Sequence, residues 1–156
     1  MPYHNTNTPR STGGTGGNRS NVPPRPASPQ GLAEENALIA RLAALNELEA
    51  ETLVKIAEKA GKSFSESRIK TTQIRRIHEH IIRQLTRART MKGETAKEIR
   101  LLKYHLVYAA GRERTMKPFA DFFNPILDKV HEMKDLERFR QLFDAVLAYH
   151  KFFESN

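Results

Sequence analysis

Hydrophobic residues recur at helical spacing along most of the chain after its first thirty residues. Between residues 32 and 60 the larger ones fall on one broad stripe, which predicts one long helix or two shorter ones with a break near Glu51. This stripe consists of Leu38, Leu42, Leu45, Leu53 and Ile56. Gly61 follows it, and a glycine directly after a helical pattern is typical of a helix C-terminus. We therefore expect the helix to end at Gly61.

The next periodic segment predicts a helix from Thr71 or Thr72, whose hydroxyl would cap it, to about Ala88. At about 100° per residue its large aliphatic side chains lie close to one line and face the core. These residues are Ile74, Ile77, Ile81 and Leu85, followed by Ala88. Four basic or titratable residues fall on the opposite side of the same helix. We call them the basic stripe: Arg76, His80, Arg83 and Arg87.

A loop at residues 91–93 precedes a predicted helix over residues 94–110, for which Gly111 would be the C-terminal cap. Two apolar faces run along this helix, which predicts a central helix buried on both sides. The first face holds Ile99, Leu102, Leu106 and Ala110, and the second holds Leu101, Tyr104 and Tyr108.

Two further helices complete the predicted fold. A stripe from Phe119 to Met133 contains Pro125, which either kinks that helix or opens a new one. Asp135 is placed to cap a last helix, whose apolar positions are Leu136, Phe139, Phe143, Val146, Leu147 and His150. No segment shows the alternation of a β-strand. We expect an all-α bundle of about five helices over residues 31–156.

Residues 1–30 differ in composition from the rest of the chain. They contain six of the eight prolines and four of the eight glycines, with few sizeable hydrophobic residues. Such a segment buries too little apolar surface to offset its ordering entropy, so we expect a disordered tail.

Positive charge is concentrated in one part of the sequence. Residues 62–117 carry fifteen basic and five acidic residues, whereas the whole chain has a net charge of +8. The rest of the chain is therefore slightly negative overall. Concentrated positive charge attracts phosphate backbones, so a polyanion is the expected partner.

Several kinds of chemistry are not indicated. The chain has no cysteine, which excludes disulfides and thiolate sites. In the triplet His78-Glu79-His80 the two histidines point about 200° apart on a helix, whereas two ligands from one helix need a spacing of three or four. No phosphate loop, nucleophile elbow or catalytic carboxylate pair is recognisable. We expect no metal, no cofactor and no enzymatic activity; with no signal peptide or membrane span recognisable, a soluble, cytoplasmic protein is expected.

Two clusters are candidates for binding phosphate. At the start of the helix from Thr71, unpaired backbone N–H groups are flanked by basic residues, which suits an anion. A second cluster lies at the end of the following helix, where Arg112 follows Tyr108 and Gly111. The two clusters and the basic stripe together supply seven candidate residues. They are Lys70, Gln73, Arg75, Arg76, Arg83, Arg87 and Arg112. An arginine-rich face without a row of exposed aromatic residues favours backbone contact over base stacking.

Two other functions fit parts of the pattern. A helix-turn-helix DNA-binding protein would read bases with Gln73 and Arg76, and it would show sequence preference and a dimeric site. A scaffold would self-associate through Phe152, Phe153 and the aromatic helix that contains Phe119. The charge distribution favours nucleic-acid binding over a scaffold.

Four segments in register resemble the small subunit of type III-A CRISPR effector (Csm) complexes. They are LVKIAEKA at residues 53–60, TTQIR at 71–75, LLKYHLVYAAGR at 101–112 and FDAVLAYHKFF at 143–153. The resemblance covers about residues 52–156. Thr72 stands where the family usually has serine, and the family gives no role to residues 1–51.

The resemblance implies a five-helix, non-catalytic protein that lies in several copies along the guide RNA and its paired target RNA. Its partners would be those two RNAs, further copies of itself, the repeating backbone subunit and the large subunit. Catalysis would belong to other subunits, in a complex that serves antiviral defence. By position in the family motifs, Gln73, Arg75 and Arg112 are the matched candidates for RNA contact, whereas the other four come from the helical wheel.

Overall fold

The computed structural model describes residues 30–90 and 95–155, and within them the protein is entirely helical. The described part contains the α-helices α1 (Ala33–Ala40), α2 (Ala50–Glu66), α3 (Thr71–Thr90), α4 (Thr95–Arg112), α5 (Lys117–Leu127) and α6 (Met133–Glu154). Three short 3-10 turns join them: η1 (Gln30–Leu32), η2 (Leu45–Glu47) and η3 (Arg114–Met116). The predicted all-α bundle is confirmed, with one α-helix more than expected. Nearly all of the predicted tail and the predicted loop at residues 91–93 lie outside the described residues.

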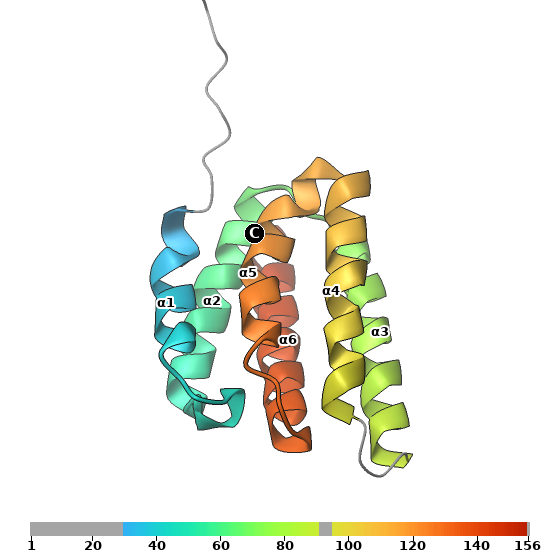
Figure 1. Ribbon diagram of the computed structural model, residues 1–156. Helices are drawn as coiled ribbons and strands as arrows, with labels where there is room; N and C mark the ends of the chain where they lie inside the picture. The colour runs from blue at the N-terminus through green and yellow to red at the C-terminus, as the bar shows by residue number, and fades with distance from the viewer. Residues whose placement is uncertain (1–29, 91–94, 156) are drawn as a thin grey trace, which may run out of the picture.

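The helices lie roughly parallel or antiparallel to one another. Figure 1 shows α1 and α2 on one side of the α5–α6 pair, and α3 and α4 on the other. The core is rich in aromatic rings because α2, α5 and α6 turn phenylalanines toward one another. Phe123 lies at its centre, with ring centroids 4.7 Å from Phe119 and 4.9 Å from Phe143. Phe64 of α2 packs against the same group, 5.0 Å from Phe119.

Residues 32–60, predicted as one long helix or two shorter ones, form α1 and the first part of α2. Of the two alternatives, the one with two helices is correct, but the break lies between α1 and α2, over residues 41–49, and Glu51 is already inside α2. Four residues of this region, Leu32, Ile39, Leu45 and Leu48, belong to the buried core. Leu38 does not, because its side chain is 47% exposed, so its predicted place on the core stripe is wrong.

Gly61 does not end a helix, which corrects the prediction from its position. It lies inside α2, where the backbone of α6 passes so closely that only a hydrogen atom fits. A Cβ at this position would lie 2.6 Å from Cβ of Tyr149 and 2.7 Å from the backbone nitrogen of His150. The glycine therefore serves helix packing, a requirement set by a partner helix about 90 residues away in sequence.

The true end of α2 is a Schellman turn with Arg68 in the left-handed conformation, at φ 59°. The Ile69 N–H donates to the Phe64 carbonyl at 3.2 Å, and the Arg68 N–H donates to the Ser65 carbonyl at 3.0 Å. Ile69 and Phe64 are both buried, which supplies the apolar contact that accompanies this motif. The turn brings the chain directly into α3.

The start of α3 is held by α6. The Thr71 hydroxyl donates to Glu154 at 2.5 Å instead of capping its own helix, and His150 Nε2 donates to the Ile69 carbonyl at 2.7 Å. His150 is fully buried, which confirms its predicted place in the core. The hydrogen bond from Thr71 lowers the pKa of the Glu154 carboxyl, since it stabilises the charged form.

Two helix boundaries near the C-terminus differ from expectation. Pro125 lies within α5, which continues two residues further to Leu127, so it does not open a new helix. Asp135 lies at the third position of α6 and Glu132 occupies the N-cap, and together they form a capping box. Asp135 also accepts the Asn46 N–H at 2.8 Å. Burial alone would raise the pKa of Asp135, but the hydrogen bonds that it accepts from the backbone N–H groups of His131, Asn46 and Glu132 lower it overall.

The helix α4 covers the bundle on one side only. Ile99, Leu102 and Leu106 are buried as predicted, but the second apolar face is open: Leu101 is 47% exposed, Tyr104 71% and Tyr108 69%. The predicted central helix buried on both sides is therefore wrong, because α4 lies at the edge of the bundle (Figure 1). Gly111 is also inside α4 and is not the cap, since the helix runs on to Arg112.

Candidate nucleic-acid interface

The periodicity of α3 separates its side chains into a core face and a solvent face, as the sequence predicts. Ile74, Ile77, Ile81 and Leu85 are buried, whereas the arginines of the basic stripe are exposed. The fourth member of the stripe, His80, is half-buried against α4. The stripe is thus a real surface feature that extends along about 16 Å of helix, at 1.5 Å per residue.

Two contacts fix how α3 and α4 lie alongside each other. The rings of His80 and His105 are stacked at a tilt, with centroids 3.9 Å apart. Seven residues further along α3, Arg87 Nε lies 3.9 Å from a carboxylate oxygen of Glu98, which is seven residues earlier on α4. The helices therefore run antiparallel.

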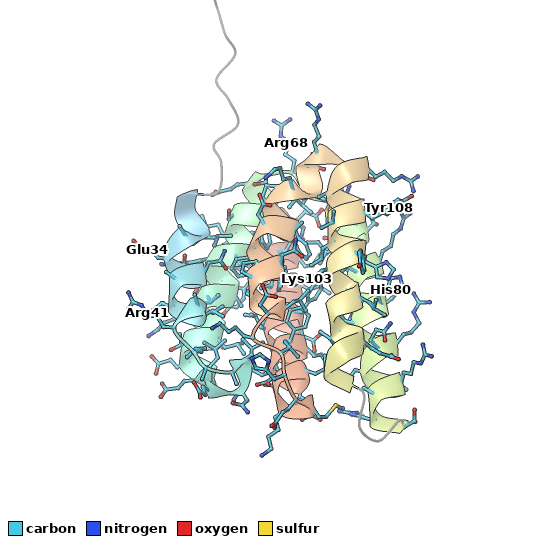
Figure 2. The ribbon with its side chains drawn as sticks, viewed as in Figure 1. Glu34, Arg41, Arg68, His80, Lys103 and Tyr108 are labelled. Carbon is cyan, nitrogen blue, oxygen red and sulfur yellow. The ribbon has the colours of Figure 1, made fainter. Side chains whose placement is uncertain are left out.

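This register brings the separate candidates of the sequence onto one face. Because the two helices are antiparallel, residues before His80 on α3 lie beside residues after His105 on α4. Arg76 is therefore level with Tyr108, and Gln73 with Arg112. In Figure 2, His80 and Tyr108 lie on the same side of the molecule, the side formed by α3 and α4. We call this surface the outer α3–α4 face. It consists of Arg76, His80, Arg83 and Arg87 on α3, and of Leu101, Tyr104, His105, Tyr108 and Arg112 on α4.

Three of the seven predicted residues take other places. Arg75 is exposed but lies about 100° round α3 from Arg76, toward the side away from α4. Lys70 is exposed in the turn before α3, near Arg68 at the end of the bundle where α4 also ends (Figure 2). Gln73 is half-buried, and its side-chain carbonyl accepts the Lys70 N–H at 2.8 Å, which makes it a helix cap.

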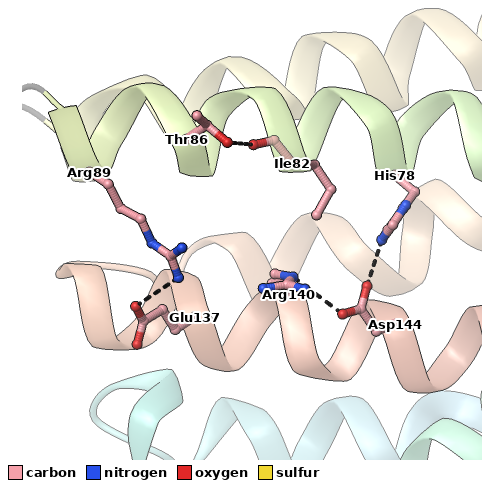
Figure 3. Close-up of polar contacts among 7 residues, drawn as sticks. All are labelled: His78, Ile82, Thr86, Arg89, Glu137, Arg140 and Asp144. Atoms are coloured by element: carbon pink, nitrogen blue, oxygen red, sulfur yellow. Dashed lines mark hydrogen bonds and ion pairs between the residues drawn. The ribbon is translucent and has the colours of Figure 1, made fainter.

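The arginines of α3 differ in whether an acidic residue neutralises them. On the α6 side, Arg89 pairs with Glu137 at 3.4 Å and His78 pairs with Asp144 at 2.5 Å (Figure 3). On the outer face, within the part of the chain that the structure describes, neither Arg76, Arg83 nor Arg112 has a carboxylate within ion-pair distance. Arg83 bonds only to the Glu79 carbonyl of its own helix, at 3.4 Å. The outer face therefore carries positive charge that is not neutralised locally.

The two histidines of the triplet contact different helices. His78 reaches α6, where its ring also stacks on Phe143, and His80 reaches α4. Among the described residues no group of three or more histidine or acidic side chains is arranged to hold a metal ion. None of the described helices has the length and apolar character needed to cross a bilayer.

His80 is held in its neutral form by its surroundings. Burial is the main cause that lowers its pKa, and the neighbouring His105 and Arg83 lower it further. Since the unfolded chain binds this proton more readily, stability from His80 is complete above about pH 6.5 and is lost as the pH falls below that value.

We expect acidification from pH 7.5 to 5.5 to lower the urea midpoint of the protein. In the variant His80→Gln the urea midpoint should fall less, because the variant lacks the imidazole whose protonation destabilises the folded state. The comparison of the two midpoint shifts checks this, and equal shifts would contradict it. Asp135 and Glu154 do not interfere, since their lowered pKa values place their titration at more acidic pH.

A comparison with known protein families matches most of the chain. The model of the family described as Csm2 Type III-A matches residues 47–156, which is well over half of the chain. The chain belongs to the Csm2 Type III-A family. It is accordingly a small subunit of a type III-A Csm effector complex. No curated protein and no solved structure gives a significant match.

The Csm2 match begins about five residues before the resemblance seen in the sequence and ends at the last residue. It includes α2 to α6 and therefore the whole outer α3–α4 face. It leaves out α1, which nevertheless packs on the same core through Ile39.

Sequence reasoning missed one part of this face. It placed Tyr104 and Tyr108 in the core and treated the surface as lacking exposed aromatic residues, and both statements are wrong. The helical wheel showed that the two tyrosines share a face, but it contains no information on whether another helix covers that face.

Proposed function

We propose that this small subunit binds RNA through the outer α3–α4 face, in contact with the sugar-phosphate backbone of the guide RNA and its target RNA. The observation that carries the proposal is the set of outward arginines without acidic partners in the described part of the chain: Arg76, Arg83 and Arg112. On the α6 side of the same helix Arg89 is paired with Glu137, so the contrast with Arg76 and Arg83 lies within one element.

The charge distribution along the chain supports the same surface. The fifteen basic residues of segment 62–117 span the end of α2, the whole of α3 and α4 and the start of α5. Guanidinium groups on a rigid helix suit phosphate oxygens, which they bind in a planar, bidentate geometry. Backbone contact of this kind is independent of base sequence, as a subunit that must accept any guide requires.

In the complex, the subunit would hold the RNA rather than cut it. Several copies would lie along the guide–target duplex next to the repeating backbone subunit and the large subunit. We assign the chain no catalytic role, since its sequence lacks a convergent set of catalytic groups.

The helix-turn-helix alternative is less well supported. It requires the first turn of α3 to enter a major groove with Gln73 free to reach bases. The Gln73 side chain is instead half-buried and bonded to the Lys70 N–H. The scaffold alternative loses the aromatic helix it relied on, because Phe119, Phe122 and Phe123 of α5 are at most 1% exposed.

The proposal predicts how the purified protein binds nucleic acids. We expect it to bind single-stranded RNA and a guide–target RNA duplex with little sequence preference. Each phosphate contact should add about 0.7 to 0.9 to the slope of log affinity against log salt, so four contacts give a slope of roughly 3. Fluorescence anisotropy with several RNA sequences and one DNA duplex measures this. Tighter, sequence-dependent binding to duplex DNA would favour the alternative and contradict the proposal.

A further inference from the structure

The outer surface of α4 presents large apolar side chains to solvent. Tyr104 is 71% exposed, Tyr108 69%, Val107 58% and Leu101 47%. Within residues 30–90 and 95–155, neither tyrosine takes part in a ring contact with another aromatic side chain. Exposed aromatic rings grouped on one helix face mark a surface that is covered by something else.

The two tyrosines follow each other along α4 at a spacing of four residues, so their rings project from the same side of the helix, one turn apart. The register fixed by the His80–His105 and Arg87–Glu98 contacts puts Tyr108 level with Arg76 and Leu101 level with Arg83. Aromatic rings and arginines therefore lie side by side on the outer α3–α4 face. Phosphate binding alone gives the tyrosines no role.

The charge of the face indicates which partner covers it. If a second copy of this chain paired with the same face symmetrically, it would bring two sets of Arg76, Arg83 and Arg112 into one interface with no acidic residue among the named members of the face, and this excess of like charge is unfavourable. The four apolar side chains are also far fewer than the roughly 20–30 residues per side of a standard protein interface. A nucleic acid supplies both complements, with phosphates for the arginines and base faces for the rings.

We propose that Tyr104 and Tyr108 stack on unpaired bases of RNA whose backbone is held by Arg76, Arg83 and Arg112. This rests on the proposed function and adds a second component to it. Stacking requires a base whose face is accessible, so this component acts on unpaired nucleotides and not on the interior of a duplex. It is independent of sequence, because every base has a π-face. It also depends little on salt, because no counterion is released.

The test compares the full chain with the double variant Tyr104→Ala/Tyr108→Ala. The probes are a uridine oligonucleotide and an abasic oligonucleotide of the same length, each titrated at several salt concentrations. We expect the double variant to bind the uridine oligonucleotide at least about thirtyfold more weakly, since two stacked bases contribute at least about 1 kcal/mol each. Its salt slope should be unchanged, and it should bind the abasic oligonucleotide as the unmodified chain does. The matched variant Tyr104→Phe/Tyr108→Phe should retain affinity, because stacking needs the ring and not the hydroxyl.

The possible results separate this inference from the function beneath it. If the unmodified chain binds the uridine oligonucleotide and the alanine variant binds it equally well, the stacking role is overturned while backbone binding stands. If the unmodified chain binds neither oligonucleotide, both proposals fail. If the alanine substitutions leave RNA affinity unchanged but convert a dimer to a monomer in sedimentation, the face belongs to a second copy and the inference is wrong.

Discussion

Replacing Gly61 by alanine is expected to destabilise the bundle by about 2–3 kcal/mol, the upper part of the range for added volume in a packed core. The added Cβ would lie within 2.9 Å of three atoms of α6, two of which are backbone. Backbone cannot rotate away as a side chain can, so one of the two helices has to shift. The shift would reach the start of α3, because His150 and Glu154 of α6 bond to Ile69 and Thr71.

The matched control for this prediction is Gly111→Ala. Gly111 is also helical, but no heavy atom lies within 4 Å of the position that its Cβ would take. Alanine there should stabilise the protein by about 0.5–1 kcal/mol, since it removes the conformational entropy of glycine without a clash. Urea unfolding followed by circular dichroism measures both changes. Equal stability of the Gly61→Ala variant and the unmodified protein would contradict the close packing of α2 on α6.

The same two glycines illustrate what the sequence can and cannot predict. Both follow apolar helical patterns, and both were expected to end a helix. A local pattern contains no information on a partner helix, so it cannot distinguish the close approach at Gly61 from the open space at Gly111. The end of α2 depends instead on a non-glycine residue in the left-handed conformation, Arg68.

Within a single helix, by contrast, the sequence was informative. The start of α3 and its division into buried isoleucines and outward arginines follow from a period of 3.6 residues. The exposure of Tyr104 and Tyr108 did not follow from it, because exposure depends on where the bundle ends. The convergence of Arg112 with the basic stripe needed the antiparallel pairing of α3 with α4, which is a tertiary property.

The second large effect is expected on RNA affinity, from replacing Arg76, Arg83 and Arg87 together by alanine. All three side chains are exposed, and alanine is a strong helix former, so α3 should remain folded. Arg76 and Arg83 have no acidic partner, and Arg87 has only a long pair of 3.9 Å with Glu98, so we count all three as phosphate contacts. Their loss should weaken binding by more than tenfold at low salt. The matched control replaces Arg41, which follows α1, together with Lys134 and Arg138 of α6, and it removes the same charge. The control should retain most of the affinity, because net charge alone acts weakly at a distance in salt.

The salt dependence of these three proteins tests the central claim, that the outer α3–α4 face holds RNA by its backbone. Anisotropy titrations of one single-stranded RNA at a series of salt concentrations give a slope for each protein. We predict that the variant lacking Arg76, Arg83 and Arg87 loses about 2 from the slope of log affinity against log salt, while the control keeps the slope of the unmodified chain. An unchanged slope in that variant, with circular dichroism showing an intact helical fold, would contradict the assignment of this face to RNA.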